Sequence, residues 1–271
     1  MEPSKIITLL TDFGDRDTYV GQMKGAALAI EPDARLVDLC HEVPAHDVRA
    51  GAFLLETGYA AFPPGTVHVA VVDPGVGTDR RMVAVRAGEY YFLAPDNGLL
   101  GRVLGRQKAT GAHVLQNPSL FGPRGSATFA GRDVFAPAAA WILRGMDLER
   151  LGPPAGELVT PDPDRPRIEL GRPVRVPVVH VDHFGNVVLD VRVETLTSVL
   201  GHRPGPDTAM RLVTEAGQVT RVLETYGHAG GREPFFLVNS AGYLEIAVDS
   251  GRACDVLGLR PGTHPELKVG R

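Results

Sequence analysis

Two aspartates stand where the chain leaves predicted strands, and carboxylates at such positions can serve catalysis or ligand binding. Asp12 lies in a Thr-Asp-Phe-Gly sequence directly after the apolar run 6–10. Asp73 opens an Asp-Pro-Gly-Val-Gly sequence directly after the apolar run 67–72. Ligands of open α/β sheets bind beyond the carboxyl ends of the strands. A tight turn explains either sequence taken singly, but two carboxylates ending two parallel strands favour a shared site.

Two arginines follow Asp73 at a spacing that allows one of them to return to it. Arg80 and Arg81 lie seven and eight residues further on, ahead of the next strand. An aspartate–arginine pair can orient a water molecule and keeps the carboxylate ionised. Spacing alone favours a structural salt bridge or a solvated arginine. Gly75 and Gly77 would let backbone approach a ligand, but no third glycine opens a helix, so this is not a dinucleotide fingerprint.

Other common signatures of catalysis or metal binding are missing from the sequence. It has neither the phosphate-binding GxxxxGK[ST] nor the nucleophile-bearing GxSxG, and its nine histidines show no metal-ligand spacing. Cys40 and Cys254 lack any CxxC pattern, which favours two buried thiols over a disulfide or a metal pair. We therefore expect no bound metal.

Composition narrows the class of protein further. The 271 residues are 44% hydrophobic, which is enough for one large or two modest cores. A net charge of −4 gives no basic field to attract nucleic acid or an anionic membrane. No apolar run approaches the ~18–20 residues of a membrane span, and the N-terminus has no signal-peptide layout. We expect a cytoplasmic protein.

The elements that must position these residues alternate between strand and helix in the first half of the chain. Asp47 is a plausible N-cap for the second helix. Such alternation implies a mainly parallel sheet with right-handed crossovers. We predict strands at 6–10, 35–39 and 67–72, helices at 19–30, 48–61 and 133–143, and a hairpin of strands 82–86 and 90–94.

A proline-rich stretch separates this region from a series of short strands. We interpret residues 153–173 as a stiff linker between an N-terminal domain, 1–152, and a C-terminal domain, 174–271. The fold class predicted is α/β, with flanking helices on the first sheet and a smaller antiparallel β domain. Strands of the second domain are expected at 174–181, 187–189, 218–223, 235–238 and 243–248.

Six short sequences, taken in order, resemble the S-adenosylmethionine (SAM) hydrolase family. These adenosine-forming enzymes, the SAM hydroxide adenosyltransferases, are related to the fluorinases and chlorinases. Each sequence is weakly specific alone, and together they span nearly the whole chain. They lie at residues 10–14, 72–77 with Arg80 and Arg81, 95–100, 128–133 apart from Ala130, 184–186, and 239–244 apart from Ala241.

The resemblance implies a homotrimer that binds SAM as substrate between the N-terminal domain of one subunit and the C-terminal domain of its neighbour, with no cofactor. Asp12 would hold the ribose hydroxyls, because a carboxylate can accept from both members of a diol. Phe129 would pack near the ribose. Further substrate-binding residues implied are Asn186 at the adenine edge, Phe184 and Tyr226 around the base, and Asp182, Ser240 and the backbone beside Asn239 at the methionine end.

For the reaction, the resemblance implies an Asp–Arg–His set that holds the attacking water or hydroxide. Asp73 and Arg80 match the first two members, but the position expected to be histidine is Ala130. Ala130 is either a natural divergence or an engineered substitution, and the intact pattern around it favours the latter. We expect hydrolysis of SAM to adenosine and L-methionine to be slowed, with binding mostly retained.

Two alternatives stay open. With Ala130 as its natural state, the chain would be a catalytically silent protein that binds SAM or adenosine. A chlorinase-like halide adenosyltransferase is favoured less: Gly131 resembles the chlorinase, but the Asp73 carboxylate would repel an anion that needs an apolar, desolvating pocket.

Overall fold

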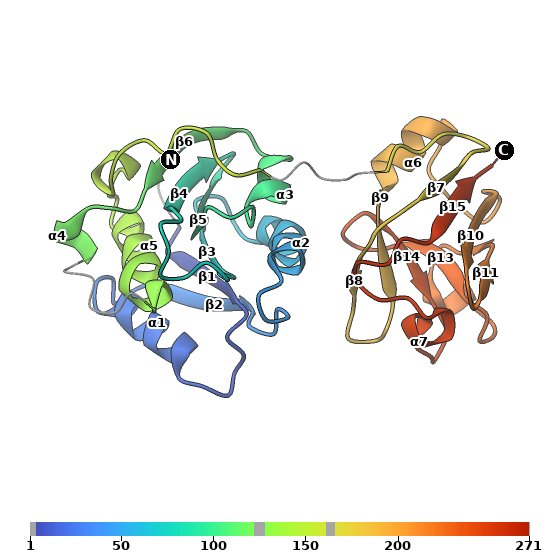
Figure 1. Ribbon diagram of the computed structural model, residues 1–271, viewed down its shortest axis with the longest axis horizontal. Coiled ribbons are helices and arrows are strands. Elements are labelled where there is room, and N and C mark those ends of the chain that lie inside the picture. Colours follow the sequence, from blue (N-terminus) through green and yellow to red (C-terminus); the bar gives the residue numbers. More distant parts are fainter. Residues whose placement is uncertain (1–3, 122–127, 161–165, 271) are drawn as a thin grey trace. The chain divides into compact units, whose positions relative to one another are not determined.

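The computed structural model describes residues 4–121, 128–160 and 166–270. The chain divides into two compact units, Met1–Pro163 and Asp164–Arg271 (Figure 1). The predicted fold class is confirmed, since a mainly parallel sheet with helices is followed by antiparallel β structure. Among the residues described, no helix combines the length and apolarity needed to cross a membrane.

The N-terminal unit is built on a six-stranded sheet of order β2-β1-β3-β5-β4-β6. The first four strands in this order run parallel, whereas β4 is antiparallel to both of its neighbours. The turns after the parallel strands therefore leave the sheet at one edge. The strands are β1 (Ile6–Thr11), β2 (Arg35–Cys40), β3 (Val67–Val71), β4 (Met82–Ala87), β5 (Tyr90–Pro95) and β6 (Ala109–Val114).

The helices of this unit follow the predicted order, but the helix predicted at 48–61 ends at Gly58 and is followed by the 3-10 turn η1 (Tyr59–Ala61). The second helix begins after Asp47, whose Oδ1 accepts a hydrogen bond from the Ala50 amide at 2.9 Å. The helix predicted at 133–143 is entered through a π-helical turn. The helices are α1 (Tyr19–Leu28), α2 (Val48–Gly58), η1 (Tyr59–Ala61), α3 (Gly101–Leu104), α4 (Pro118–Phe121), η2 (Gly131–Phe135), α5 (Ala136–Leu143) and η3 (Leu148–Arg150).

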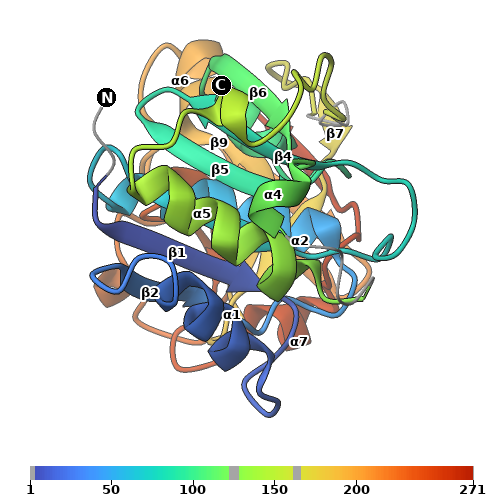
Figure 2. The same ribbon diagram turned by 90° about the vertical axis from the view of Figure 1, so that its left-hand side faces the viewer.

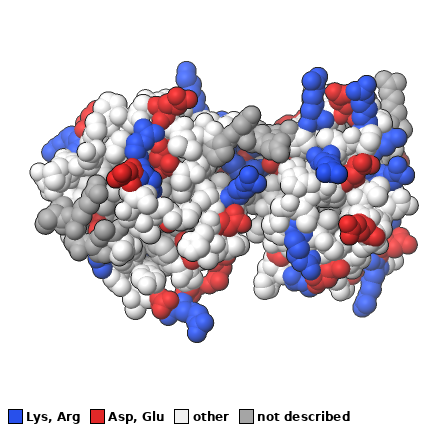
Figure 3. Space-filling model, viewed as in Figure 1, with Lys and Arg blue, Asp and Glu red and all other residues white. Residues whose placement is uncertain are grey.

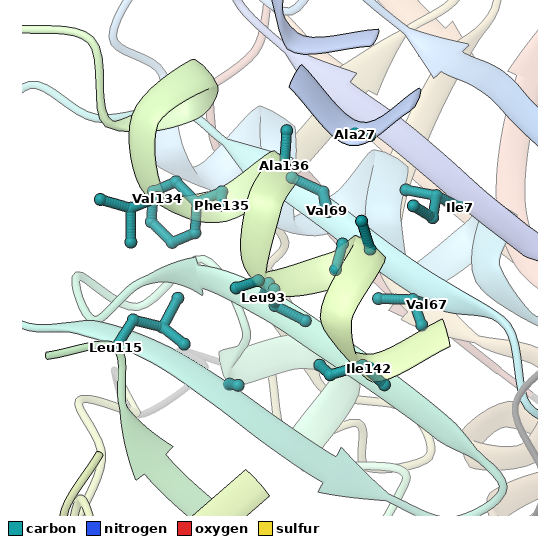
Figure 4. Close-up of a cluster of buried hydrophobic side chains, with 14 of the residues drawn as sticks. Ile7, Ala27, Val67, Val69, Leu93, Leu115, Val134, Phe135, Ala136 and Ile142 are labelled. Carbon is teal, nitrogen blue, oxygen red and sulfur yellow. The ribbon is translucent and has the colours of Figure 1, made fainter. Parts of the chain in front are cut away.

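Both faces of the sheet are covered, which explains why β3 is apolar throughout. Successive side chains of a strand point to opposite faces. Val67 and Val69 therefore pack into the cluster formed with α1 and α5, whereas Ala70 and Val72 pack with α2 (Figures 2 and 4). Loops at the carboxyl edge are thus held on a rigid, two-sided core.

The C-terminal unit contains two sheets, ordered β11-β10-β15-β7 and β12-β13-β14-β9-β8. Every strand pair described in it is antiparallel except β12 with β13. Residues of both sheets share one apolar core. Its elements are β7 (Pro173–Arg175), β8 (Val178–Val181), β9 (Val187–Arg192), α6 (Val193–Leu200), β10 (Met210–Thr214), β11 (Gly217–Val219), β12 (Arg221–Val222), η4 (Tyr226–His228), β13 (Phe235–Val238), β14 (Tyr243–Ala247), α7 (Ala253–Leu257) and β15 (Glu266–Val269).

Two strands predicted here are wrong as single elements. The run 174–181 is divided between β7 and β8, which lie in different sheets. Pro177 stands at the break, where its missing N–H removes a donor from the ladder, while its carbonyl accepts the Asp190 amide at 2.8 Å. The run 218–223 is likewise divided between β11 and β12.

Parts of the stretch interpreted as a linker pack onto the units themselves. The Ala155 amide donates to the Ala112 carbonyl at 2.8 Å, and Ala155 is buried in the N-terminal core. Ile168 is buried in the C-terminal core. The burial of Ala155 and Ile168 shows that the proline-rich stretch 153–173 is partly structural rather than wholly a spacer; residues 161–165 lie outside the described residues.

Charged side chains are mixed by sign on the surface. On the face shown in Figure 3, basic and acidic side chains are interspersed over both units. On this face, therefore, neither sign of charge dominates.

Candidate active site

The polar turns of the N-terminal unit leave adjacent strands. Thr11 is the register partner of Val71 across β1 and β3, and neighbouring strands lie about 4.8 Å apart. Asp12 and Asp73 therefore leave the sheet at the same edge. Asn97, in the turn after β5, donates its Nδ2 to the Val72 carbonyl at 2.9 Å. This hydrogen bond holds the turn after β5 against the start of the turn that carries Asp73.

The structure pairs Asp73 with Arg80. Arg80 Nε lies 2.8 Å from Oδ1 and 2.6 Å from Oδ2 of Asp73, and Nη2 also contacts Oδ2. The two side chains are only 5% and 13% exposed. Gly75 lies beside the pair, and a Cβ there would make ordinary van der Waals contacts, 3.4 Å from Arg80 Cγ and 3.7 Å from Asp73 Oδ1. The result is a shielded carboxylate held by a charge-assisted contact.

Arg81, the other arginine that spacing allowed, does not serve Asp73. Its guanidinium pairs with Asp96 and donates to the carbonyls of Ala155 and Glu157. The second Asp96 oxygen accepts the Val159 amide at 2.8 Å. Arg81 therefore fastens residues 155–159 beside the turn, a structural role.

Asp12 is held in place through one of its two oxygens. Oδ2 accepts the His46 amide at 2.8 Å, and His46 has a left-handed φ of 67°. The Asp12 side chain is 8% exposed. Among the described residues no donor reaches Oδ1, which leaves that oxygen for a ligand hydroxyl.

Three aromatic rings meet beside Asp12. The Phe129 ring is edge-on to Phe13 and Tyr19, at centroid distances of 5.9 and 5.3 Å. The Arg132 guanidinium lies 5.0 Å from the Phe129 centroid. A Cβ at Gly131 would lie 3.0 Å from Met23 Sδ and 3.3 Å from Phe129. The close packing thus explains a glycine at 131, independently of any halide chemistry.

Ala130 stands directly before η2 with ordinary right-handed torsions, φ −58° and ψ −29°. It is partly buried and packs against the core cluster of α1 and α5. Its methyl group supplies no hydrogen-bonding atom. A π-helical turn follows, a feature frequent at functional sites.

In the C-terminal unit, Asp182 and Asn186 close the β8–β9 turn on each other. Asp182 Oδ1 accepts the Asn186 amide at 2.8 Å, and Oδ2 accepts Asn186 Nδ2 at 3.0 Å. This contact orients the Asn186 side chain, leaving its carbonyl oxygen as an acceptor. Phe184 at the tip is 71% exposed, an unusual position for an apolar ring.

Glu245, which was not among the predicted site residues, connects two that were, Tyr226 and Asn239. Glu245 of β14 is buried and accepts the Tyr226 hydroxyl at 2.6 Å and Asn239 Nδ2 at 3.1 Å. Asn239 Oδ1 in turn accepts the amides of Ala241 and Tyr243, both at 3.0 Å. The sequence signal was available, since Glu245 is a lone carboxylate within an apolar strand. Ser240 is exposed at the same turn.

Burial and charge act together on this group. Burial, followed by the negative charge of Asp182, raises the pKa of Glu245 despite the hydrogen bonds it accepts. Burial, followed by the Glu245 acceptor, raises the pKa of Tyr226, so its hydroxyl stays a donor.

Strand register explains how these residues come together. Glu245 is paired with Val188 on one side and Leu237 on the other, and Val188 is paired with His180. Paired residues share a face, and so do residues two apart. Glu245, Leu237, Val188 and His180 therefore share one face of the five-stranded sheet, and Asn239, Asn186 and Asp182 lie in the turns at the ends of these strands.

Within the described ranges, no group of three or more His, Cys, Asp and Glu side chains is arranged to hold a metal ion. The carboxylates of the site are engaged with arginine, amide or hydroxyl groups. As hydrogen-bond acceptors, carboxylates suit recognition of a polar organic molecule that carries hydroxyl and cationic groups.

Comparison with known proteins gives a consistent result over the whole chain. Profiles described as SAM hydroxide adenosyltransferase N-terminal and C-terminal domains match residues 7–152 and 176–266. An (R)-S-adenosyl-L-methionine hydrolase of Salinispora tropica is 38% identical, with all of both chains covered. A fluorinase of Nocardia brasiliensis is 28% identical, covering 98% of this chain and 97% of its own. A crystal structure of an uncharacterized conserved protein from Thermotoga maritima superposes with a TM-score of 0.89 at 33% identity, covering 97% and 99%.

Proposed function

Because the chain belongs to the SAM hydroxide adenosyltransferase family, we propose that it hydrolyses S-adenosyl-L-methionine to adenosine and L-methionine. The observation that carries the proposal is the shielded Asp73–Arg80 pair at the carboxyl edge of the sheet. Ligands bind at this edge in folds of this class. Relatives that are 33–38% identical to this chain also carry the hydrolase name, whereas fluorinases are 27–28% identical to it.

The substrate activates itself, so the protein needs no cofactor and no general acid. Water oxygen forms a bond to ribose C5′ while the C5′–S electron pair goes to sulfur, which leaves as a neutral thioether. The oxygen must also lose a proton. Asp73 accepts that proton as the C–O bond forms, and Arg80 fixes the carboxylate. Placement can contribute several kcal/mol, and a positioned base about 10²–10⁴-fold.

Recognition of the substrate is divided between the two units. In the first, Asp12 Oδ1, which no donor of the described residues reaches, takes the ribose hydroxyls, and Phe129 packs beside the sugar. In the second, the oriented Asn186 reads the adenine edge, and the exposed Phe184 ring stacks on the base. Tyr226 supplies the other stacking ring, while Asp182, Ser240 and the backbone near Asn239 take the methionine ammonium and carboxylate.

We propose that each site forms between the N-terminal unit of one subunit and the C-terminal unit of its neighbour in a homotrimer. Support comes from the resemblance and from the division of ligand-type groups between the two units. Cyclic trimers have one heterologous interface repeated three times, so a chain with complementary halves makes three equal sites.

Ala130 sets the expected rate. A histidine there would offer the nucleophile a second polar partner, which the alanine methyl cannot replace. We therefore propose that SAM binds normally while the water is less constrained, so that turnover is slow. A carboxylate beside the nucleophile also disfavours an anion in its place, which argues against halide transfer.

The test is incubation of the purified protein with SAM, with mass spectrometry of the products. Adenosine and methionine in equal amounts, absent from an Asp73→Asn control, are expected. Intact SAM that is bound but not consumed would indicate a silent binding protein. Formation of 5′-chloro-5′-deoxyadenosine in concentrated chloride would indicate a halide adenosyltransferase. Identification of any co-purifying ligand gives the same distinction without added substrate.

A further inference from the structure

We propose that Glu245 is a positioning residue that holds the Tyr226 ring and the turn at residues 239–242 in fixed relation to each other. The proposal rests on the function proposed above, in which the ring binds adenine and the turn binds the amino-acid end. SAM is then recognised through one rigid frame rather than by two independent loops.

The geometry makes Glu245 the common anchor of two separate segments. One carboxylate oxygen takes the Tyr226 hydroxyl from η4 at 2.6 Å, and the other takes Asn239 Nδ2 from the β13–β14 turn at 3.1 Å. Glu245 itself sits in the middle of β14, where its neighbours Leu244 and Ile246 are fully buried. A short, buried strand is a more rigid support than either loop.

The second arm passes through Asn239 to the turn backbone. Asn239 cannot exchange its amide oxygen and nitrogen, because Oδ1 already accepts the amides of Ala241 and Tyr243. Its Nδ2 therefore needs an acceptor, and Glu245 is the one it has. The conformation of the turn that presents Ser240 is thus fixed from β14.

The first arm fixes a ring that would otherwise be free to turn. Tyr226 is 52% exposed, and its contact with Phe235 is a distant edge contact, at a centroid separation of 6.4 Å. The hydrogen bond to Glu245 consumes the hydroxyl and leaves the ring face for stacking. Preorganised rings lose less entropy when a ligand binds.

Glu245 acts through its hydrogen bonds and not through its charge, and substitutions can separate the two. In Glu245→Gln, the side-chain oxygen can accept Asn239 Nδ2 while its NH₂ donates to the Tyr226 hydroxyl, which can accept as well as donate. Glu245→Leu keeps the size and loses both arms. Glu56→Gln is the matched control, a buried glutamate of the N-terminal unit paired with Arg102 and Arg106.

The experiment measures dissociation constants for SAM and adenosine by titration calorimetry on the full chain, with Tm as a check on folding. We expect Glu245→Leu to raise the dissociation constant for SAM at least about tenfold, and Glu245→Gln to leave it within about threefold of the parent value. Glu56→Gln should lower Tm and leave both constants unchanged. Tyr226→Phe, a milder change that removes one arm, should weaken SAM and adenosine alike by about three- to tenfold.

The outcomes distinguish a failure of the positioning role from a failure of the proposed function on which it rests. A parent protein that binds neither ligand would refute the proposed function. If the parent binds SAM and Glu245→Gln binds it as weakly as Glu245→Leu, the carboxylate charge acts directly on the cationic substrate and the positioning role is wrong. Unchanged SAM affinity in a folded Glu245→Leu variant would also refute the positioning role. If Glu245→Leu does not fold, unchanged SAM affinity in Tyr226→Phe would refute it instead.

Discussion

At the scale of single residues, we expect Ala130 to be the position that most affects the rate. Its torsions are ordinary helical values, so a histidine there requires no backbone strain. We predict that Ala130→His raises the turnover of SAM by about 10²-fold, the lower end of what a positioned base contributes. The Kd for SAM should change little. The measurement is adenosine release under saturating substrate, with Ala130→Ser as a small polar control; an unchanged rate would refute a missing third member.

Individual residues also show where sequence reasoning stops. A site at the Asp73 turn was predicted because a second carboxylate, Asp12, ends another predicted strand of the same parallel sheet. The choice between Arg80 and Arg81 was not decidable from spacing, since it depends on Asp96 and the carbonyls of residues 155 and 157. Glu245 carried a signal, a carboxylate in an apolar strand, but its partners lie 6 and 19 residues away along the chain.

At the scale of elements, the turn between β8 and β9 depends on Gly185. Its φ is +86°, and a Cβ would lie 2.6 Å from Arg252 Cβ and 3.0 Å from Arg252 Cα. We predict that Gly185→Ala costs more than the ~1–2 kcal/mol of a left-handed alanine, because backbone must also move. Gly201, with φ +80° and open space around it, is the control that shows strain alone.

Urea unfolding of the two variants measures this difference, and SAM affinity measures its effect on the site. Gly185→Ala should displace the Asp182–Asn186 turn and weaken binding, whereas Gly201→Ala should affect stability only. Equal losses of stability in the two variants would show that the contact with Arg252 is unimportant.

Elements were predictable where burial made the pattern regular. β3, covered on both faces, and α2, with its Asp47 cap, were found close to their true bounds. β6 and β10 were missed, because β6 is largely exposed and β10 is only five residues long, with Arg211 and Val213 exposed on either side of buried Leu212. The division of 174–181 depends on which sheet each half joins, and that is set by distant strands β15 and β9.

At the scale of the whole molecule, acid stability should depend on His68. This histidine is fully buried among Tyr59, Phe62, Tyr90 and Phe92, with Nδ1 2.7 Å from Thr8 Oγ1. Burial lowers its pKa from 6.5 to about 3. Below pH 6.5 the His68 imidazole binds a proton in the unfolded chain, whereas in the folded chain it stays neutral until the pH is about 3. The free energy of unfolding therefore falls by about 1.4 kcal/mol per pH unit between those values, and by nothing above them.

Urea titrations from pH 7 to pH 4 test this for the parent and for His68→Gln, which can still bond Thr8. The variant should be less stable at pH 7. Its free energy of unfolding should nevertheless fall less steeply as the pH is lowered, with a slope smaller by about 1.4 kcal/mol per pH unit, the equivalent of one proton. Parallel curves for the two proteins would mean that His68 does not control the acid response.

The assembly proposed for the site makes a quantitative prediction about mixed oligomers. Asp73→Asn disables only the N-terminal half of a site, and Asn186→Ala only the C-terminal half. If each site takes its halves from two neighbouring subunits, random trimers of the two inactive variants contain intact sites in about a quarter of positions. Co-expression, carried out with Ala130→His present in both chains if that raises the rate, should therefore restore about a quarter of the parent activity. Sites formed within single chains would restore none, because every chain would carry one disabled half.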